Sequence, residues 1–177
     1  SNVSFGYRPN RPVIKQLSLN CPQGSVTALV GPSGGGKSTL AALAGRFHDV
    51  SSGAIQLTVG SETFDIRTLK ERSLQQAMGF VFQELRLTAG TIAETIALAR
   101  PDAAPSEIIS AAKSAQIHDR IIRLPRGYQS VIGEDVRLSG GEAQRISIAR
   151  TLLTNPPVLI LDEATAMADP DAEHLIQ

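Results

Sequence analysis

The sequence predicts an α/β protein with a parallel-sheet core, an antiparallel β subdomain and an inserted α-helical subdomain. Three observations predict this fold class. The apolar run Val26–Val30 leads into a glycine-rich loop and then into a helix-forming segment. A second apolar run, Val158–Leu161, ends at the acidic pair Asp162-Glu163. Between the two runs, residues 84–138 have helical patterning and no core-strand run, which is typical of an inserted lobe.

Length and composition limit the classes of function. The chain has 177 residues, enough for one domain, which we expect to consist of a core (1–83 and 139–177) around a helical insertion (84–138). Because 17 basic residues balance 17 acidic ones and Trp is absent, we expect no nucleic-acid partner. The single cysteine, Cys21, excludes an internal disulfide. No apolar run is long enough to cross a bilayer, so we expect no lipid insertion by this segment.

The N-terminal segment is predicted to form a β-hairpin or two adjacent strands. Residues Asn2–Tyr7 and Val13–Leu19 alternate apolar and polar side chains on either side of a turn-forming RPNRP. Tyr7 ends the first strand, where an aromatic ring commonly shields the edge of a sheet. Stacking on a nucleotide base is the alternative role for this side chain.

The segment Gly31–Thr39 reads GPSGGGKST and fits the pattern G-x-x-x-x-G-K-[ST] of a phosphate-binding loop. Glycines let successive backbone N–H groups converge on an anion, and the following helix adds the positive end of its dipole. Lys37 supplies a cation for the β- and γ-phosphates, and the Ser38 hydroxyl can bind Mg²⁺. The sequence therefore predicts a nucleoside triphosphate site at Ser33, Gly34, Gly35, Gly36, Lys37, Ser38 and Thr39.

The next segments alternate strand and helix patterns. We expect strands at Ala54–Val59, Phe64–Ile66 and Met78–Phe82, and a short polar helix at Arg67–Gln76. Gln83 follows the last of these strands. A glutamine there is usually a solvent-facing loop residue, but this strand is expected to lie beside the strand that precedes the phosphate-binding loop.

The inserted span is predicted to contain helices at Thr91–Ala99 and Ser106–Ile117, the second with Pro105 in its first turn. It is followed by LSGGE, in which Ser139 and Glu142 have the S-x-x-E spacing of a capping box. Capping boxes are common, and the plain interpretation of this one is the start of a helix. The glycines between the two residues also leave N–H groups open to an anion, which would make half of a phosphate site.

Val158–Leu161 is predicted to be a central strand that ends at an acidic pair. Asp162 would hold Mg²⁺ through water, and Glu163 would polarise an attacking water as a general base. Alone, the pattern fits solvated acids at a strand end. Combined with the phosphate-binding loop, it favours hydrolysis of a triphosphate.

With Gly31–Thr39, Gln83, Leu138–Glu142 and Val158–Glu163 in this order, the chain resembles the nucleotide-binding domain of an ABC transporter. The segment LSGGEAQR is the most specific element, and the first and last segments correspond to the Walker A and Walker B motifs. The resemblance implies a P-loop NTPase core of the RecA-like type. It also implies ATP and Mg²⁺ as cofactors and an ATPase that powers transport across a membrane.

The resemblance further implies a head-to-tail dimer, homomeric or heteromeric, with two ATP molecules at its interface. Each phosphate-binding loop would face the partner's cap, which is Ser139, Gly140, Gly141 and Glu142. By resemblance Tyr7 stacks on adenine, so base stacking replaces shielding of the sheet edge as the expected role of this side chain. By the same resemblance Val13 lines the adenine site. Gln83 would reach Mg²⁺ and the attacking water, and Asp169 would cross the dimer interface.

The order of the Tyr7 strand, GTIAETIAL (Gly90–Leu98), LPRGYQSVIGE (Leu124–Glu134) and LSGGE is similar to exporter-type half-transporters, in which a membrane domain precedes the ATPase. This implies a location at the cytoplasmic face of a bacterial plasma membrane. The stretch RFHDV (Arg46–Val50) favours siderophore-handling members. A soluble ABC-type ATPase of repair, translation or cluster assembly is the alternative function, although the 84–138 span is too short for a coiled-coil insertion. A GTPase would need an N-K-x-D tetrapeptide, which the sequence lacks.

The chain departs from the family pattern at three places. Only Asp135-Val136-Arg137 separates the GE of SVIGE from LSGGE, one residue fewer than usual, and Ala168 replaces a bulkier aliphatic residue. The chain ends at Gln177, before the switch histidine that the family has. We therefore expect these 177 residues by themselves to hydrolyse ATP slowly.

Overall fold

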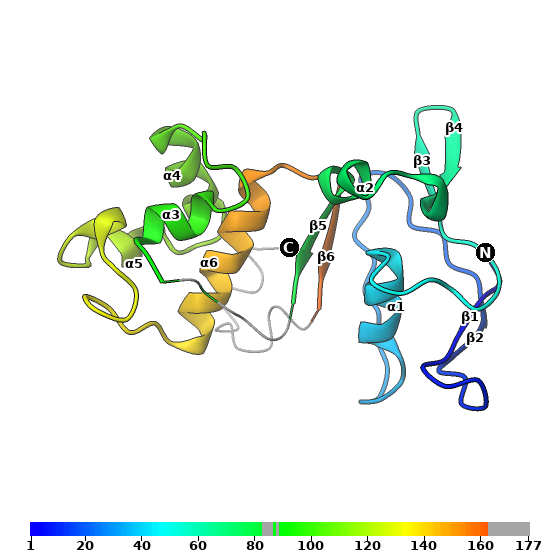
Figure 1. The fold of residues 1–177 in the computed structure, drawn as a ribbon. Helices are drawn as coiled ribbons and strands as arrows, with labels where there is room; N and C mark the ends of the chain where they lie inside the picture. Colours follow the sequence, from blue (N-terminus) through cyan, green and yellow to red (C-terminus); the bar gives the residue numbers. More distant parts are fainter. Residues whose placement is uncertain (83–86, 88, 163–177) are drawn as a thin grey trace. The chain divides into compact units, whose positions relative to one another are not determined.

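The computed structural model of the chain describes residues 1–82, 87 and 89–162 (Figure 1). The chain divides into two compact units, Ser1–Met78 and Gly79–Gln177. Each unit has its own cluster of buried apolar side chains. None of the helices within these described ranges is long and apolar enough to cross a lipid bilayer.

The first unit contains two antiparallel hairpins and three helical segments. Its elements are β1 (Val3–Phe5), β2 (Ile14–Leu17), α1 (Lys37–Ala44), β3 (Gln56–Val59), β4 (Glu62–Asp65), a 3₁₀ turn (Ile66–Thr68) and α2 (Glu71–Ala77). β1 pairs with β2, as the sequence predicted. β3 pairs with β4, a pairing that the sequence did not predict, and β4 lies at Glu62–Asp65 where a strand was expected at Phe64–Ile66. The predicted polar helix is shorter than expected, because the 3₁₀ turn takes up its first residues.

Helix α1 is held against the first hairpin by apolar packing. Leu43 is completely buried, and it packs with Val3, Phe5 and Ile14 of the hairpin. Burying side chains of this size contributes about 1.5–3 kcal/mol each. This packing fixes the start of α1, and with it the end of the glycine-rich loop.

The prediction of a buried strand at Val26–Val30 is not met in this structure. Residues 25–30 have no regular secondary structure, and Val26 and Val30 are 82% and 93% exposed. An apolar parallel strand is stable only where neighbouring strands bond to its backbone and other elements cover both faces. In the first unit β1 pairs with β2 and forms a bridge to Ser52, and β3 pairs with β4, so none of these pairings includes residues 25–30.

The second unit combines a strand pair with a helical cluster. Its elements are β5 (Met78–Val81, which begins at the last residue of the first unit), α3 (Ile92–Ala97), α4 (Pro105–Ser114), α5 (His118–Ile122), a 3₁₀ turn (Gly127–Gln129), α6 (Gly140–Leu153) and β6 (Val158–Leu161). Pro105 occupies the first turn of α4, as the sequence predicted. Thr91, expected as the first residue of a helix, is instead the N-cap of α3.

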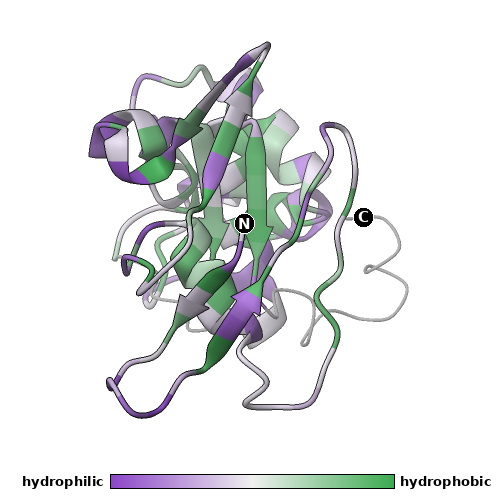
Figure 2. Ribbon diagram, turned by 90° about the vertical axis from the view of Figure 1, so that its right-hand side faces the viewer, coloured by the Kyte–Doolittle hydropathy of each residue, from purple (hydrophilic) through white to green (hydrophobic). Residues whose placement is uncertain are grey.

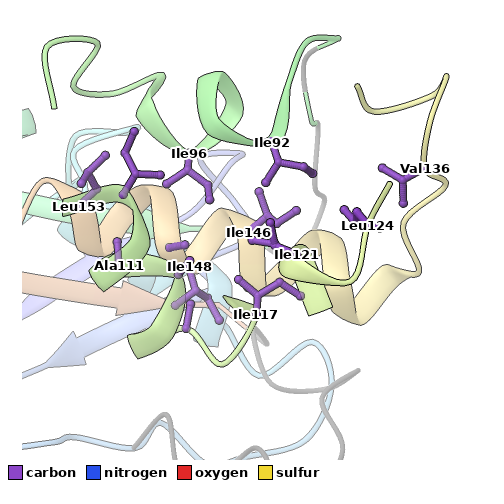
Figure 3. Packing of buried hydrophobic residues seen from close by; sticks show 14 of the residues in the cluster. Ile92, Ile96, Ala111, Ile117, Ile121, Leu124, Val136, Ile146, Ile148 and Leu153 are labelled. Carbon is purple, nitrogen blue, oxygen red and sulfur yellow. The ribbon is translucent and has the colours of Figure 1, made fainter. Parts of the chain in front are cut away.

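Helix α6 packs on α3 and α4, and its buried apolar side chains lie on more than one side of the helix. Ile146, Ile148 and Ala149 are at most 1% exposed, and Figure 3 shows the two isoleucines among the side chains of the neighbouring helices. The buried guanidinium of Arg150 adds a hydrogen bond from its Nε to the carbonyl of Thr95 on α3, 2.9 Å away. Helix α6 is therefore joined to the segment predicted as a helical insertion. The predicted boundary at residue 139 stays a prediction.

Strands β5 and β6 lie side by side and end at the same edge. The backbone N–H of Asp162, just after β6, donates to the carbonyl of Val81 at the end of β5 at 3.0 Å. β6 consists of four apolar residues and is green throughout in Figure 2. The side chain that follows β6 is thus placed at the carboxyl edge of the pair, where α/β proteins form their sites.

Candidate functional site

The glycine-rich loop has the backbone that its sequence predicts. Gly34 and Gly36 have φ angles of +77° and +88°, a region that other residues rarely adopt. A Cβ at Gly36 would lie 2.8 Å from Ile14 Cδ1 and 3.2 Å from Val13 Cγ1. Val13, the predicted adenine-site residue, therefore lies beside the loop, and only glycine fits at position 36.

Lys37 is folded back onto the beginning of the loop. Its Nζ donates to the carbonyl oxygens of Gly31 at 2.9 Å and Pro32 at 3.1 Å. These bonds keep the ammonium group on the loop, where a bound phosphate can accept from it in place of the two carbonyls.

The N-terminus of α1 suits an anion. Its N-cap is Gly36, which has no side chain to bond the first N–H groups, and its first turn contains no acidic residue. The helix dipole therefore has no internal carboxylate to offset it there. With Lys37 beside it, this donor set fits the phosphates of a nucleoside triphosphate. The exposed Ser38 hydroxyl belongs to the same turn and has the oxygen that Mg²⁺ prefers.

Tyr7 lies next to the phosphate-binding helix. Its hydroxyl is 3.2 Å from the Oγ1 of Thr39, which is buried in the first turn of α1. The ring is 59% exposed, and it contacts Phe5 and His48 edge-on at centroid distances of 5.1 Å and 5.4 Å. A partly exposed ring held in this way can act as a platform for a base, and the structure brings it to the same helix as the loop.

Ser139 and Glu142 form the predicted capping box at the start of α6. The Ser139 hydroxyl accepts the Glu142 N–H at 3.2 Å, and the Glu142 carboxylate accepts the Ser139 N–H at 2.8 Å. Burial raises the pKa of the Glu142 carboxyl, but the Ser139 N–H and Arg120 outweigh it, so the pKa lies below its ordinary value. Gly140 and Gly141 occupy the first turn between them.

The loop before this cap is anchored despite its short length. Asp135 accepts the Val131 N–H at 2.7 Å and the Arg126 Nε–H at 2.9 Å, and these bonds hold its pKa below the usual range. Val136 is buried in the helical cluster. The loop thus leads into Ser139 from a fixed position.

The predicted site residues fall into two groups. Tyr7, Val13 and the loop 33–39 lie together in the first unit, whereas the cap and Asp162 lie in the second. Gln83, Glu163 and Asp169 lie outside the described residues. Among the residues that the structure describes, no group of three or more His, Cys, Asp or Glu side chains could hold a metal ion.

Besides the contact of Tyr7 with Thr39, two contacts of the site were missed from the sequence. Arg120 bonds the carboxylate of Glu142, and His48 packs against the ring of Tyr7. The partners are 22 and 41 residues apart in the chain, so no local pattern connects them. The stretch RFHDV drew attention to His48 for another reason, and nothing in the sequence singled out Arg120.

Comparison with known proteins decides the family. The model of the ABC transporter family matches residues 14–166, which include the loop, the cap and the strand-end acids. The chain belongs to the ABC transporter family. Within this family it has the P-loop NTPase fold and is an ATP-binding domain, as the resemblance predicted.

Relatives and a solved structure agree with this assignment. The chain is 59% identical over 176 residues to the mycobactin import ATP-binding/permease protein IrtA of Mycolicibacterium smegmatis, covering 99% of the chain and 20% of that protein. It is 49% identical to the putative multidrug export ATP-binding/permease protein YgaD of Bacillus subtilis, covering 99% of the chain and 30% of that protein. The structure of a bacterial Atm1-family ABC exporter with ATP bound matches with a TM-score of 0.88 and 44% identity, over 99% of this chain and 30% of that one.

These matches confirm the exporter-type resemblance of this ABC ATP-binding domain. The chain spans between a fifth and a third of the length of the relatives it matches. The two relatives are named ATP-binding/permease proteins, so each of them has a permease part besides the region matched here.

Proposed function

We propose that this domain is the ATP-hydrolysing motor of a membrane transporter and works as a head-to-tail dimer around two ATP molecules. The observation that carries the proposal is the presence of two different helix starts in one ABC domain. The start of α1 has no side-chain cap and no acid, whereas the start of α6 is a complete capping box. The start of α1 suits direct binding of the phosphates, and the start of α6 suits a second contact with the phosphates of ATP bound to a partner subunit.

Each residue has a proposed part in this cycle. Tyr7 and Val13 contact the adenine, the loop amides and Lys37 hold the phosphates, and Thr39 closes the first turn of α1 beneath them. Mg²⁺, when bound, would offset charge on the transferring phosphate, and the residues assigned to it are Ser38, Gln83 and Asp162. Glu163 accepts the proton of the attacking water. The contacts proposed to cross to the partner's ATP are Ser139, Gly140, Gly141, Glu142 and Asp169.

The proposed partners are a second nucleotide-binding domain and a membrane domain at the cytoplasmic face of the membrane. The permease part in the names of the relatives supports a transporter over the alternative of a soluble ATPase. One relative is named for import and another for export. We therefore propose neither a transported substrate nor a direction of transport.

Site-directed cross-linking tests the head-to-tail dimer. In the complete protein with Cys21→Ser, one copy would bear Ser33→Cys in the phosphate-binding loop and a second copy Ser139→Cys in the cap. Cys21 is the single cysteine of these 177 residues and it is exposed, so without the substitution it could itself form cross-links. With Cys21→Ser, only the introduced thiols of this domain can react. We expect an oxidised product of doubled mass when ATP is present and both variants are mixed.

Either variant by itself is the matched control and should give little product, because like positions do not face each other in a head-to-tail pair. Equal product with and without ATP, or none in the mixture, would count against the ATP-bound dimer. Gel mobility under non-reducing conditions is the measurement.

Replacing Tyr7 tests the adenine platform. Tyr7→Ala should weaken ATP binding about tenfold, because stacking of a base on an aromatic ring contributes on the order of 1–3 kcal/mol. Tyr7→Phe keeps the ring and loses only the hydroxyl contact with Thr39, so its effect should be under about threefold. Calorimetry with ATP measures both variants.

Inorganic triphosphate, which has no base, provides the control ligand. Its affinity should be unchanged by Tyr7→Ala if the ring acts on adenine. An equal loss for ATP and for triphosphate would assign Tyr7 to the shape of the loop instead.

A further inference from the structure

The Glu142 carboxylate makes contacts with both of its oxygens. Oε2 accepts the Ser139 N–H at 2.8 Å, and Oε1 accepts the Arg120 Nε–H at 2.5 Å. The Glu142 side chain is only 14% exposed, whereas that of Arg120 is 43% exposed. One oxygen thus completes the cap of α6, and the other is paired with a cation from a different helix.

This carboxylate creates an electrostatic difficulty for the proposed role of the cap. An acid in the first turn stabilises a helix start, but it also places a negative charge where a second anion has to approach. The start of α1, by contrast, contains no acid and has Lys37 beside it. The start of α6 needs a cation to compensate Glu142 if a triphosphate is to approach it.

Arg120 is the cation that meets this need. It belongs to α5, whose neighbouring residues Ile117 and Ile121 are each 1% exposed in the apolar cluster. Its backbone is therefore fixed by packing, and the guanidinium reaches across to the cap from a defined place. The partly exposed guanidinium also keeps the carboxylate turned toward α5.

We propose that Arg120 is a positioning residue for the cap: it neutralises Glu142 and holds its carboxylate aside, so that the phosphates of ATP on a partner subunit can bind at Ser139. This inference rests on the proposed head-to-tail dimer and assigns part of the charge balance of that site to α5. If the ion pair only stabilised the packing of α5 on α6, removing the Glu142 charge as well would not restore binding of the partner's ATP.

The test compares four variants of the complete protein in a cross-linking pair that keeps Ser139: Ser33→Cys in one copy, and Arg137→Cys, at an exposed position two residues before the cap, in the other. Arg120→Leu should raise the ATP concentration for half-maximal cross-linking about fivefold, the effect expected of an uncompensated charge at a helix terminus. Arg123→Leu, which removes an exposed positive charge at the end of the same helix, is the matched control and should change it less than twofold. Arg120→Lys keeps the charge and should fall between wild type and Arg120→Leu.

The decisive variant is the double substitution Arg120→Leu with Glu142→Gln. Removing the carboxylate removes the need for the cation, so the double variant should recover at least half of the loss. A purely structural ion pair predicts that the double variant is as impaired as Arg120→Leu alone, and this result would overturn the proposal. So would an Arg120→Leu effect no larger than that of Arg123→Leu.

Thermal unfolding of each variant shows whether a loss of cross-linking reflects a loss of folding rather than a loss of ATP binding at the cap. If Arg120→Leu unfolds early, the comparison of Arg120→Lys with wild type decides, and a fivefold loss in that charged variant would contradict the proposal. Absence of ATP-dependent cross-linking in wild type would instead overturn the dimer, and with it this inference. Intact wild-type cross-linking without rescue would overturn the role of Arg120 alone.

Discussion

Glu163→Gln is expected to lower the rate of ATP hydrolysis by about 10²–10⁴-fold while ATP binding is kept. The amide has nearly the shape of the carboxylate but cannot accept the proton of the attacking water. Because hydrolysis is proposed to reopen the dimer, the variant should accumulate as an ATP-bound dimer. Phosphate release measures the rate, and size-exclusion chromatography with ATP measures the dimer.

Glu62→Gln, in the exposed hairpin β3–β4, is the matched control for the same change of charge. It should leave both measurements as in wild type. A Glu163→Gln variant that hydrolyses ATP at more than a tenth of the wild-type rate, or that stays monomeric with ATP, would remove Glu163 from the proposed mechanism.

Lys37→Ala is expected to weaken ATP binding by on the order of a hundredfold, since hydrogen bonds to charged groups contribute about 1.5–3 kcal/mol. In the structure the Lys37 ammonium bonds two carbonyls of its own loop, those of Gly31 and Pro32. The substitution thus removes a phosphate contact and also two bonds that hold the loop. Calorimetry with ATP gives the affinity, and thermal unfolding reports the second effect.

Lys70→Ala provides the control, because Lys70 is an exposed lysine at the start of α2 in the same unit. Inorganic triphosphate should lose affinity as strongly as ATP does, in contrast to the expected behaviour of Tyr7→Ala. If Lys37→Ala binds both ligands within threefold of wild type, the loop is not the phosphate site.

The sequence predicted best what is decided over a few residues. The capping box at Ser139 is complete within four positions, and the bonds between its two side chains need no distant partner. The hairpin β1–β2 likewise follows from alternation on both sides of a turn. The positive φ angles of Gly34 and Gly36 follow from the need of that loop for glycine.

What the sequence did not predict depends on distant partners. The run Val26–Val30 has strand-forming residues, but whether it becomes a strand depends on neighbours that lie far along the chain. The pairing of Arg120 with Glu142 joins α5 to α6, and the contact of Tyr7 with Thr39 joins the first hairpin to α1, so both depend on how separate elements pack. The roles of Gln83, Glu163 and Asp169 stay predictions.

Helix α6 has a mechanical consequence for the domain. Its 14 residues make a rod about 21 Å long, with Ser139 at one end and the short segment Thr154–Pro157, leading to β6, at the other. If this rod pivots about one end by about 10°, the other end moves by about 4 Å. Because α3 and α4 pack against α6, a displacement of those helices would also displace the cap that is proposed to contact the partner's nucleotide. A force applied to the helical cluster would therefore move the proposed contact at Ser139, at most about one length of α6 away.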